Sequence, residues 1–180
     1  MKAIVTLGFA AALLSGCGNI AAVKSFNTKF ASPTSGETAR LRVVANGMVR
    51  GVPGLSCTDW YSPGAGVIAV PQKGFADRNG ETLGMPDAKA VPAGSVSSEV
   101  LVEAGKPMVL TFLDGGRATG YNQKTTCLGM FTFIPTAGAD YEVTLKGYSA
   151  CDVDFNRIDG ARPEPVSATK ADYCSAIANF

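Results

Sequence analysis

The chain carries few of the side chains that enzymes use to attack a substrate or to move protons. Its 180 residues include no histidine, which excludes the Ser-His and Cys-His pairs of nucleophilic catalysis. Carboxylates suited to acid and base catalysis occur at Asp59, Asp77, Asp87 and Asp114, but their spacing in the sequence does not say whether any two lie together in space. We therefore expect a protein that is not an enzyme, with a hydrolase that uses a carboxylate pair as an alternative.

Cysteine is the other reactive side chain, and Cys17 stands at the end of an apolar amino-terminal segment. Lys2 is followed by an uncharged run over residues 3–13 and then by Leu14-Ser15-Gly16-Cys17. A positive start, a short apolar core and small residues are typical of a secretory signal peptide. A membrane-spanning helix would need about 20 apolar residues. We expect residues 1–16 to be a signal peptide.

The tetrapeptide that ends at Cys17 resembles the lipobox of bacterial lipoproteins. In that family the cysteine is joined to diacylglycerol, the preceding peptide is removed, and the new amino terminus is acylated, commonly with palmitate. The resemblance implies that Cys17 anchors the mature protein in a membrane of the cell envelope. Gly18 replaces the Asp that the family associates with the inner membrane, so the resemblance implies the outer membrane. The alternative is an ordinary signal peptide with a chance cysteine.

The remaining four cysteines suggest a disulfide framework. They are Cys57, Cys127, Cys151 and Cys174, and an even number in an exported chain is typical of two disulfides. A zinc site would need a CxxC pair or histidines, and the sequence has neither. We expect no metal and no cofactor. If the chain turns near residue 137, Cys127 approaches Cys151, which favours Cys127–Cys151 with Cys57–Cys174 among the three connectivities.

Composition indicates a single domain rich in β-strands. The chain has 21 glycines and 10 prolines, and its apolar segments are rich in Val, Thr, Phe and Tyr, which favours short strands joined by tight turns. With 16 basic and 15 acidic residues and no run of like charge, we expect no nucleic-acid partner. We expect a flexible tether over residues 17–37, or a short helix over 20–30, and one antiparallel β-sandwich-like domain over residues 38–180 with a short C-terminal helix.

The first predicted strands carry three arginines. Residues 38–46 alternate between apolar and polar, and Asn46-Gly47 is a strong hairpin signal that leads into a partner strand over 48–52. Arg40, Arg42 and Arg50 lie in these strands. They allow an anion-binding site, but no aromatic or glycine-rich partner accompanies them, so a solvated sheet face is favoured.

Three residues are candidates for binding. Trp60 and Tyr61 precede a loop rich in glycine and proline, and aromatic side chains there bury a large area at low entropic cost. The alternative for Trp60 is packing against a disulfide. Met85 lies in an irregular segment over residues 71–94, and connections this long are usually functional or disordered.

Several short motifs between Cys57 and Cys151 together resemble a known set of proteins. They are Gly84-Met85-Pro86, Glu99-Val100, Ala104-Gly105-Lys106-Pro107, Phe133-Ile134-Pro135 and Asp140-Tyr141-Glu142. Together they resemble a set of uncharacterised proteobacterial lipoproteins over residues 38–158. The resemblance implies a β-sandwich-like domain in the cell envelope and transfers no catalytic residue. We expect a tethered, non-catalytic binding or accessory module that contacts an envelope protein or the cell wall; the alternative is a purely structural lipoprotein.

Overall fold

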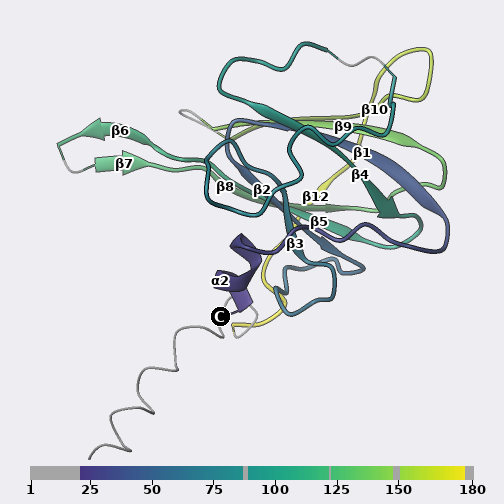
Figure 1. The fold of residues 1–180 in the computed structure, drawn as a ribbon, viewed down its shortest axis with the longest axis horizontal. Helices are drawn as coiled ribbons and strands as arrows, with labels where there is room; N and C mark the ends of the chain where they lie inside the picture. Colours follow the sequence, from purple (N-terminus) through teal and green to yellow (C-terminus); the bar gives the residue numbers. More distant parts are fainter. Residues whose placement is uncertain (1–20, 87–88, 122, 148–150, 177–180) are drawn as a thin grey trace, which may run out of the picture.

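Two five-stranded sheets pack face to face in the computed structural model, which describes residues 21–86, 89–121, 123–147 and 151–176 (Figure 1). The first sheet has the order β11 (Glu164–Pro165), β10 (Cys151–Arg157), β9 (Asp140–Gly147), β1 (Thr38–Ala45), β4 (Val96–Glu103). The second has the order β12 (Thr169–Lys170), β8 (Leu128–Phe133), β5 (Met108–Leu113), β2 (Met48–Pro53), β3 (Gly66–Ala69). The strands β6 (Arg117–Gly120) and β7 (Gln123–Thr125) form a separate hairpin. The prediction of an all-β fold is confirmed.

The hairpin predicted at Asn46-Gly47 is wrong, because β1 and β2 belong to different sheets. The chain crosses from one sheet to the other at Gly47, where a Cβ atom would lie 2.6 Å from the carbonyl oxygen of Leu113. Asn46 bonds instead to Gly147: its Nδ2 donates to the carbonyl oxygen at 3.1 Å and its Oδ1 accepts from the N–H at 2.9 Å. Asn46 and Gly47 therefore form the connection along the chain from β1 in the first sheet to β2 in the second.

The first sheet is mixed rather than purely antiparallel. Strand β1 pairs with β4 antiparallel but with β9 parallel, and local patterns cannot reveal a pairing between residues about 100 positions apart. Its inner face carries Leu41, Val43, Val100 and Val143, none of them exposed. Against them the second sheet places Leu110 and Phe112, so one core lies between the sheets.

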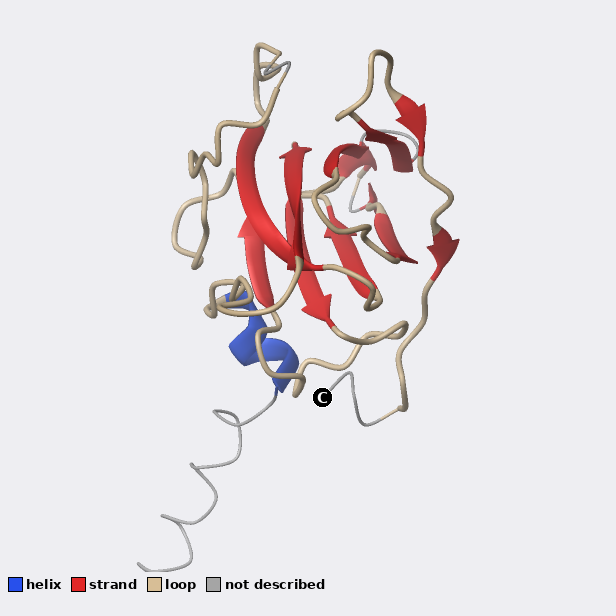
Figure 2. Ribbon diagram, turned by 90° about the vertical axis from the view of Figure 1, so that its right-hand side faces the viewer, coloured by secondary structure: helices blue, strands red, loops and turns tan. Residues whose placement is uncertain are grey.

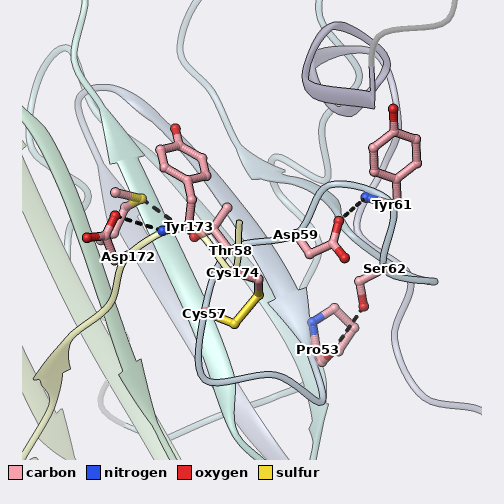
Figure 3. The surroundings of a disulfide bond; sticks show 10 residues. Pro53, Cys57, Thr58, Asp59, Tyr61, Ser62, Asp172, Tyr173 and Cys174 are labelled. Carbon is pink, nitrogen blue, oxygen red and sulfur yellow. Dashed lines mark hydrogen bonds between the residues drawn. A yellow bond between two sulfur atoms is a disulfide. The ribbon is translucent and has the colours of Figure 1, made fainter. Parts of the chain in front are cut away.

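Both predicted disulfides are present. Cys127 precedes β8 of the second sheet and Cys151 begins β10 of the first, so their bond clasps the two sheets together. Cys57 is bonded to Cys174, which ties the loop after β2 to the carboxyl-terminal segment (Figure 3). That segment forms β12 and then runs beside Thr58. The predicted C-terminal helix is therefore wrong over the described residues up to 176.

Residues 21–32 of the predicted tether are packed onto the domain, so the tether prediction is wrong there, whereas residues 34–37 are exposed. Residues 21–26 form the short helix α2 (Ala21–Phe26), which lies at one end of the sandwich (Figure 2). Ala21 and Ser25 face inward, and Phe30 enters the main core at 2% exposure. The alternative, a short helix over residues 20–30, is present in part as α2, and Val23 is on its exposed side. Within the described residues no helix is long and apolar enough to cross a membrane.

Candidate functional site

The segment between β3 and β4, residues 70–95, runs alongside the first sheet; we call it the covering segment. Asn79 holds its start, donating to the carbonyl oxygen of Val70 at 2.7 Å and accepting from the Val70 N–H at 3.1 Å. The N–H of Gly80 donates to Ser97, and the N–H of Glu99 donates to the carbonyl oxygen of Glu81, both at 2.8 Å. These bonds extend the sheet beyond β4 and satisfy polar groups that an edge strand would leave unpaired.

Arg42 is buried beneath this segment and lies between two glutamates. Cross-strand pairing places Glu99 of β4 and Glu142 of β9 on either side of it. Its Nε donates to Glu99 at 2.9 Å, its Nη2 lies 2.8 Å from the same carboxylate, and its Nη1 donates to Glu142 at 2.9 Å. The carbonyl oxygens of Met85 and Pro86 accept the other two bonds, each at 2.9 Å. Four hydrogen bonds and an additional ion-pair contact therefore hold the guanidinium within the protein.

The electrostatics of this network fix its charge state. Burial by itself would lower the pKa of Arg42, but the hydrogen bonds to Glu142 and Glu99 raise it above its usual value. Burial would likewise raise the pKa of Glu99, but the N–H groups of Leu83 and Met85 together with Arg42 lower it on balance. Both side chains are thus charged at neutral pH, and each holds backbone of the covering segment.

A second arginine fastens the same stretch of chain. The Nε and Nη2 of Arg40 each donate a hydrogen bond of 2.6 Å to the carboxylate of Asp140. Its Nη1 donates to the carbonyl oxygen of Leu83 at 3.2 Å. The hydrogen bond to Asp140 raises the pKa of Arg40. Arg40 and Arg42 therefore secure residues 83–86 from neighbouring positions on one face of β1.

A pocket of about 480 Å³ opens beside this network. Its floor is a row of side chains across the sheet, in which Val44 is opposite Ser97 on β4 and Thr144 on β9. The covering segment supplies one wall with Val91 and neighbouring residues. The other lining residues are Arg42, Gly80, Glu81, Thr82, Lys89, Ala90, Pro92, Glu99, Glu142, Lys146 and Asp154.

The pocket combines charges of both signs with an apolar wall. Its lining includes three basic and four acidic side chains, of which Arg42 and Glu99 are fully engaged with each other and with backbone. Glu142 is less so, because one carboxylate oxygen accepts from Arg42 and the other lies 3.8 Å from the ammonium of Lys89. Lys89 itself is 77% exposed. Such a lining can bind a small polar molecule or an extended chain through ion pairs and hydrogen bonds.

The aspartates considered for catalysis act locally in the structure. Asp59 accepts from the N–H of Tyr61, Asp77 from that of Asn79, and Asp114 from those of Gly116 and Cys127. Asp87 lies outside the described residues. No group of three or more metal-binding side chains occurs in the described part of the chain.

The predicted binding residues Trp60, Tyr61 and Met85 are not assembled into one site. Trp60 is 6% exposed and packs with Ala21 and Val109 on the outer face of the second sheet. Its neighbour Tyr61 is 59% exposed. Met85 lies over the first sheet, where its side chain is 6% exposed and its backbone carbonyl accepts from Arg42.

The prediction of solvated arginines is wrong for Arg42 and Arg50. Arg50 is 5% exposed and lies between two rings, 4.2 Å from the centre of Phe26 and 3.8 Å from that of Trp60. Its Nη1 donates to Ser25 at 2.5 Å. Burial lowers the pKa of Arg50 to about 10. Arg50 therefore attaches α2 to the second sheet through stacking, which the sequence could not show because Phe26 is 24 residues away.

Glu99, Glu142 and Thr144 were not predicted from the sequence as members of a site. A signal was present, since most outward-facing residues of β4 and β9 are polar, among them Ser97, Glu99, Glu142, Thr144 and Lys146. Finding the site also required the parallel pairing of β1 with β9, which brings the two polar rows together. No protein-family model matches the chain, and no curated protein matches it. Its function is therefore inferred from its residues and their geometry.

Proposed function

We propose that this protein is a lipid-anchored lipoprotein of the bacterial outer membrane that acts as a non-catalytic binding module, with the pocket beside Arg42 as its ligand site. One observation supports the site: Arg42, Glu99 and Glu142 form a buried ion-pair network. Beside it, the side chains of Ser97 and Thr144 line the floor of the pocket. The observation that carries the anchor is Leu14-Ser15-Gly16-Cys17 after an apolar segment.

The pocket has the size and construction of a ligand site. Its volume of about 480 Å³ lies within the range of about 300–1,000 Å³ that is usual for small-molecule sites. The floor residues Val44, Ser97 and Thr144 lie on three paired strands, and sites on rigid elements bind without a large ordering cost. The ends of Arg42 and Glu99 are saturated, so specificity would come from Glu142, Lys146 and Asp154.

Binding is favoured over catalysis by the state of the carboxylates. An acid catalyst near neutral pH needs a carboxyl with a raised pKa. Glu99 has a lowered pKa, and Glu142 accepts a hydrogen bond from the buried Arg42. Glu99 is therefore held as an anion and Glu142 acts as a hydrogen-bond acceptor, which suits recognition of a partner and not proton donation.

The anchor would hold this module in the envelope, within reach of an envelope protein or the cell wall. One buried acyl chain gives marginal membrane binding, whereas two or more give stable attachment. A diacylglyceryl group on Cys17 supplies two. We propose no nucleic-acid partner and no cofactor for the module.

A crosslinking experiment in cells tests this function. The photoreactive residue p-benzoylphenylalanine replaces Val91, which lines the pocket and is 45% exposed, and adducts are identified by mass spectrometry. We expect one discrete adduct that is lost when Thr144→Trp fills the pocket. The matched control Thr125→Trp, on the separate hairpin, should retain it. An adduct that survives Thr144→Trp, or none at all, would contradict the proposed site.

A further inference from the structure

The structured domain begins very close to the proposed lipid anchor. Four residue steps separate Cys17 from Ala21, and a fully extended chain covers at most about 14 Å in that distance. The polar layer on each side of a bilayer is roughly 5–8 Å thick. Since Ala21 is already part of α2 and 4% exposed, any anchor at Cys17 places this helix beside the lipid headgroups.

The helix is fixed to the domain, so the domain must follow it. Ser25 and Phe26 are held by Arg50. Directly after the helix, the N–H of Val67 donates to Thr28 at 2.7 Å and that of Phe30 donates to Val67 at 2.9 Å. These bonds pair the amino-terminal segment with β3 in parallel. The short connection therefore restricts the orientation of the whole sandwich.

The surface around α2 has the side chains that a bilayer interface accepts. Val23, Tyr61 and Phe75 are exposed at 48%, 59% and 40%, and Phe75 lies next to the helix, with its ring centre 6.3 Å from that of Phe26. Figure 3 shows Tyr61 extending on the side where α2 lies. Exposed lysines flank them at Lys24 and Lys73. Aromatic rings settle at headgroup level, and lysines are attracted to anionic lipid by about 1 kcal/mol each near the surface.

We infer that this surface, defined by Val23, Lys24, Tyr61, Lys73 and Phe75 and here called the α2 face, rests on the phospholipid headgroups of the membrane that holds the anchor. The inference rests on the proposed lipidation of Cys17. In both Figure 1 and Figure 2 the parts of the covering segment over residues 84–86 and 89–95 lie at the other end of the molecule from α2. The wall of the pocket that carries Val91 is then turned away from the bilayer.

Photo-crosslinking to lipid tests the α2 face. The full-length lipidated protein is reconstituted into vesicles of phosphatidylethanolamine and phosphatidylglycerol, with p-benzoylphenylalanine at Val23 or at Val91. The two valines are matched in exposure, at 48% and 45%. We expect lipid adducts from position 23 and few from position 91. Inserting ten Gly and Ser residues after Gly18 lengthens the connection from four to about fourteen steps, so adducts should fall about sixfold.

Flotation of the same vesicles separates the two ways in which this inference can fail. If the protein floats but position 23 gives no more lipid adducts than position 91, the anchor stands and the α2 face is not apposed to lipid. If adducts persist undiminished after the insertion, the short connection does not determine the contact, and the inference is overturned. If the protein does not float, the anchor itself is wrong and the inference falls with it.

Discussion

Arg42 is the residue on which the candidate site depends. It is 3% exposed, its two carboxylate partners come from strands on both sides of it, and it holds two carbonyl groups of the covering segment. A lysine could supply the charge but not five donors in a planar fork. The same side chain thus joins three strands to a loop.

Removing Arg42 should destabilise the protein strongly. Arg42→Ala leaves the carboxylates of Glu99 and Glu142 without their cation, and breaking a buried ion pair in this way costs about 3–5 kcal/mol in the free energy of unfolding. The measurement is urea unfolding followed by circular dichroism. Arg162→Ala, at an exposed arginine, serves as the control and should leave the unfolding curve unchanged. If Arg42→Ala lowers the free energy of unfolding no more than Arg162→Ala does, the role of the network is contradicted.

The pKa of Glu99 predicts how stability changes in acid. It is lower in the folded protein than the value of about 4.3 expected when unfolded, so its contribution is present above that pH and is lost as the pH falls below it. Glu99→Gln should lower the free energy of unfolding at pH 7 by about 2 kcal/mol. The difference in the free energy of unfolding between wild type and variant should become smaller as the pH falls below about 4.3. A gap that is constant between pH 7 and pH 3 would show that the charge is not responsible.

At the scale of elements, the arrangement of α2 and the strands shows where local patterns reach their limit. Alternation predicted the strands well, because each buries one face in a common core. The partners of those strands were predicted less well. Asn46-Gly47 has the residues of a hairpin turn, yet Asn46 bonds to Gly147, 101 residues away. Contacts between residues so far apart in the chain form only when the two sheets assemble, so a short stretch of sequence cannot predict them.

The attachment of α2 gives a prediction at this scale. Phe26→Ala removes the ring that stacks on Arg50 and packs beside Met48 and Val67. It should weaken docking of the helix by about 2 kcal/mol and speed tryptic cleavage after Lys24 several-fold. Val23→Ala, on the exposed side of the same helix, is the matched control and should leave cleavage unchanged. Equal cleavage in both variants would mean that Phe26 does not hold the helix.

At the scale of the molecule, composition was enough to predict the all-β class, and the number of cysteines with a turn near residue 137 led to the correct disulfide pairing. The two strands beside that turn do not form a hairpin, however, because β8 and β9 lie in different sheets and the disulfide joins those sheets. The candidate site was not predictable in the same way. Trp60, Tyr61 and Met85 stood out as residue types, but the fold places Trp60 and Met85 over different sheets and buries both of them. The pocket is instead made of ordinary polar residues that acquire a role only through the pairing of β4, β1 and β9.

The two disulfides should differ in their effect on global stability. They join cysteines 117 and 24 residues apart, and in the chain-entropy model the longer loop stabilises by about 1.4 kcal/mol more. The variant Cys57→Ala with Cys174→Ala should therefore unfold at lower urea concentration than Cys127→Ala with Cys151→Ala. The reverse order would indicate that the clasp between the sheets outweighs loop entropy.

The chemical state of Cys17 is the most direct test of the anchored module. The measurement is mass spectrometry of the amino-terminal peptide of the protein isolated from the outer membrane. We predict a mature chain that begins at Cys17, with a diacylglyceryl group on the thiol and an acyl group on the amine, and we predict that Cys17→Ser leaves the protein without lipid. A chain that begins at another residue, or an unmodified Cys17, would contradict the account.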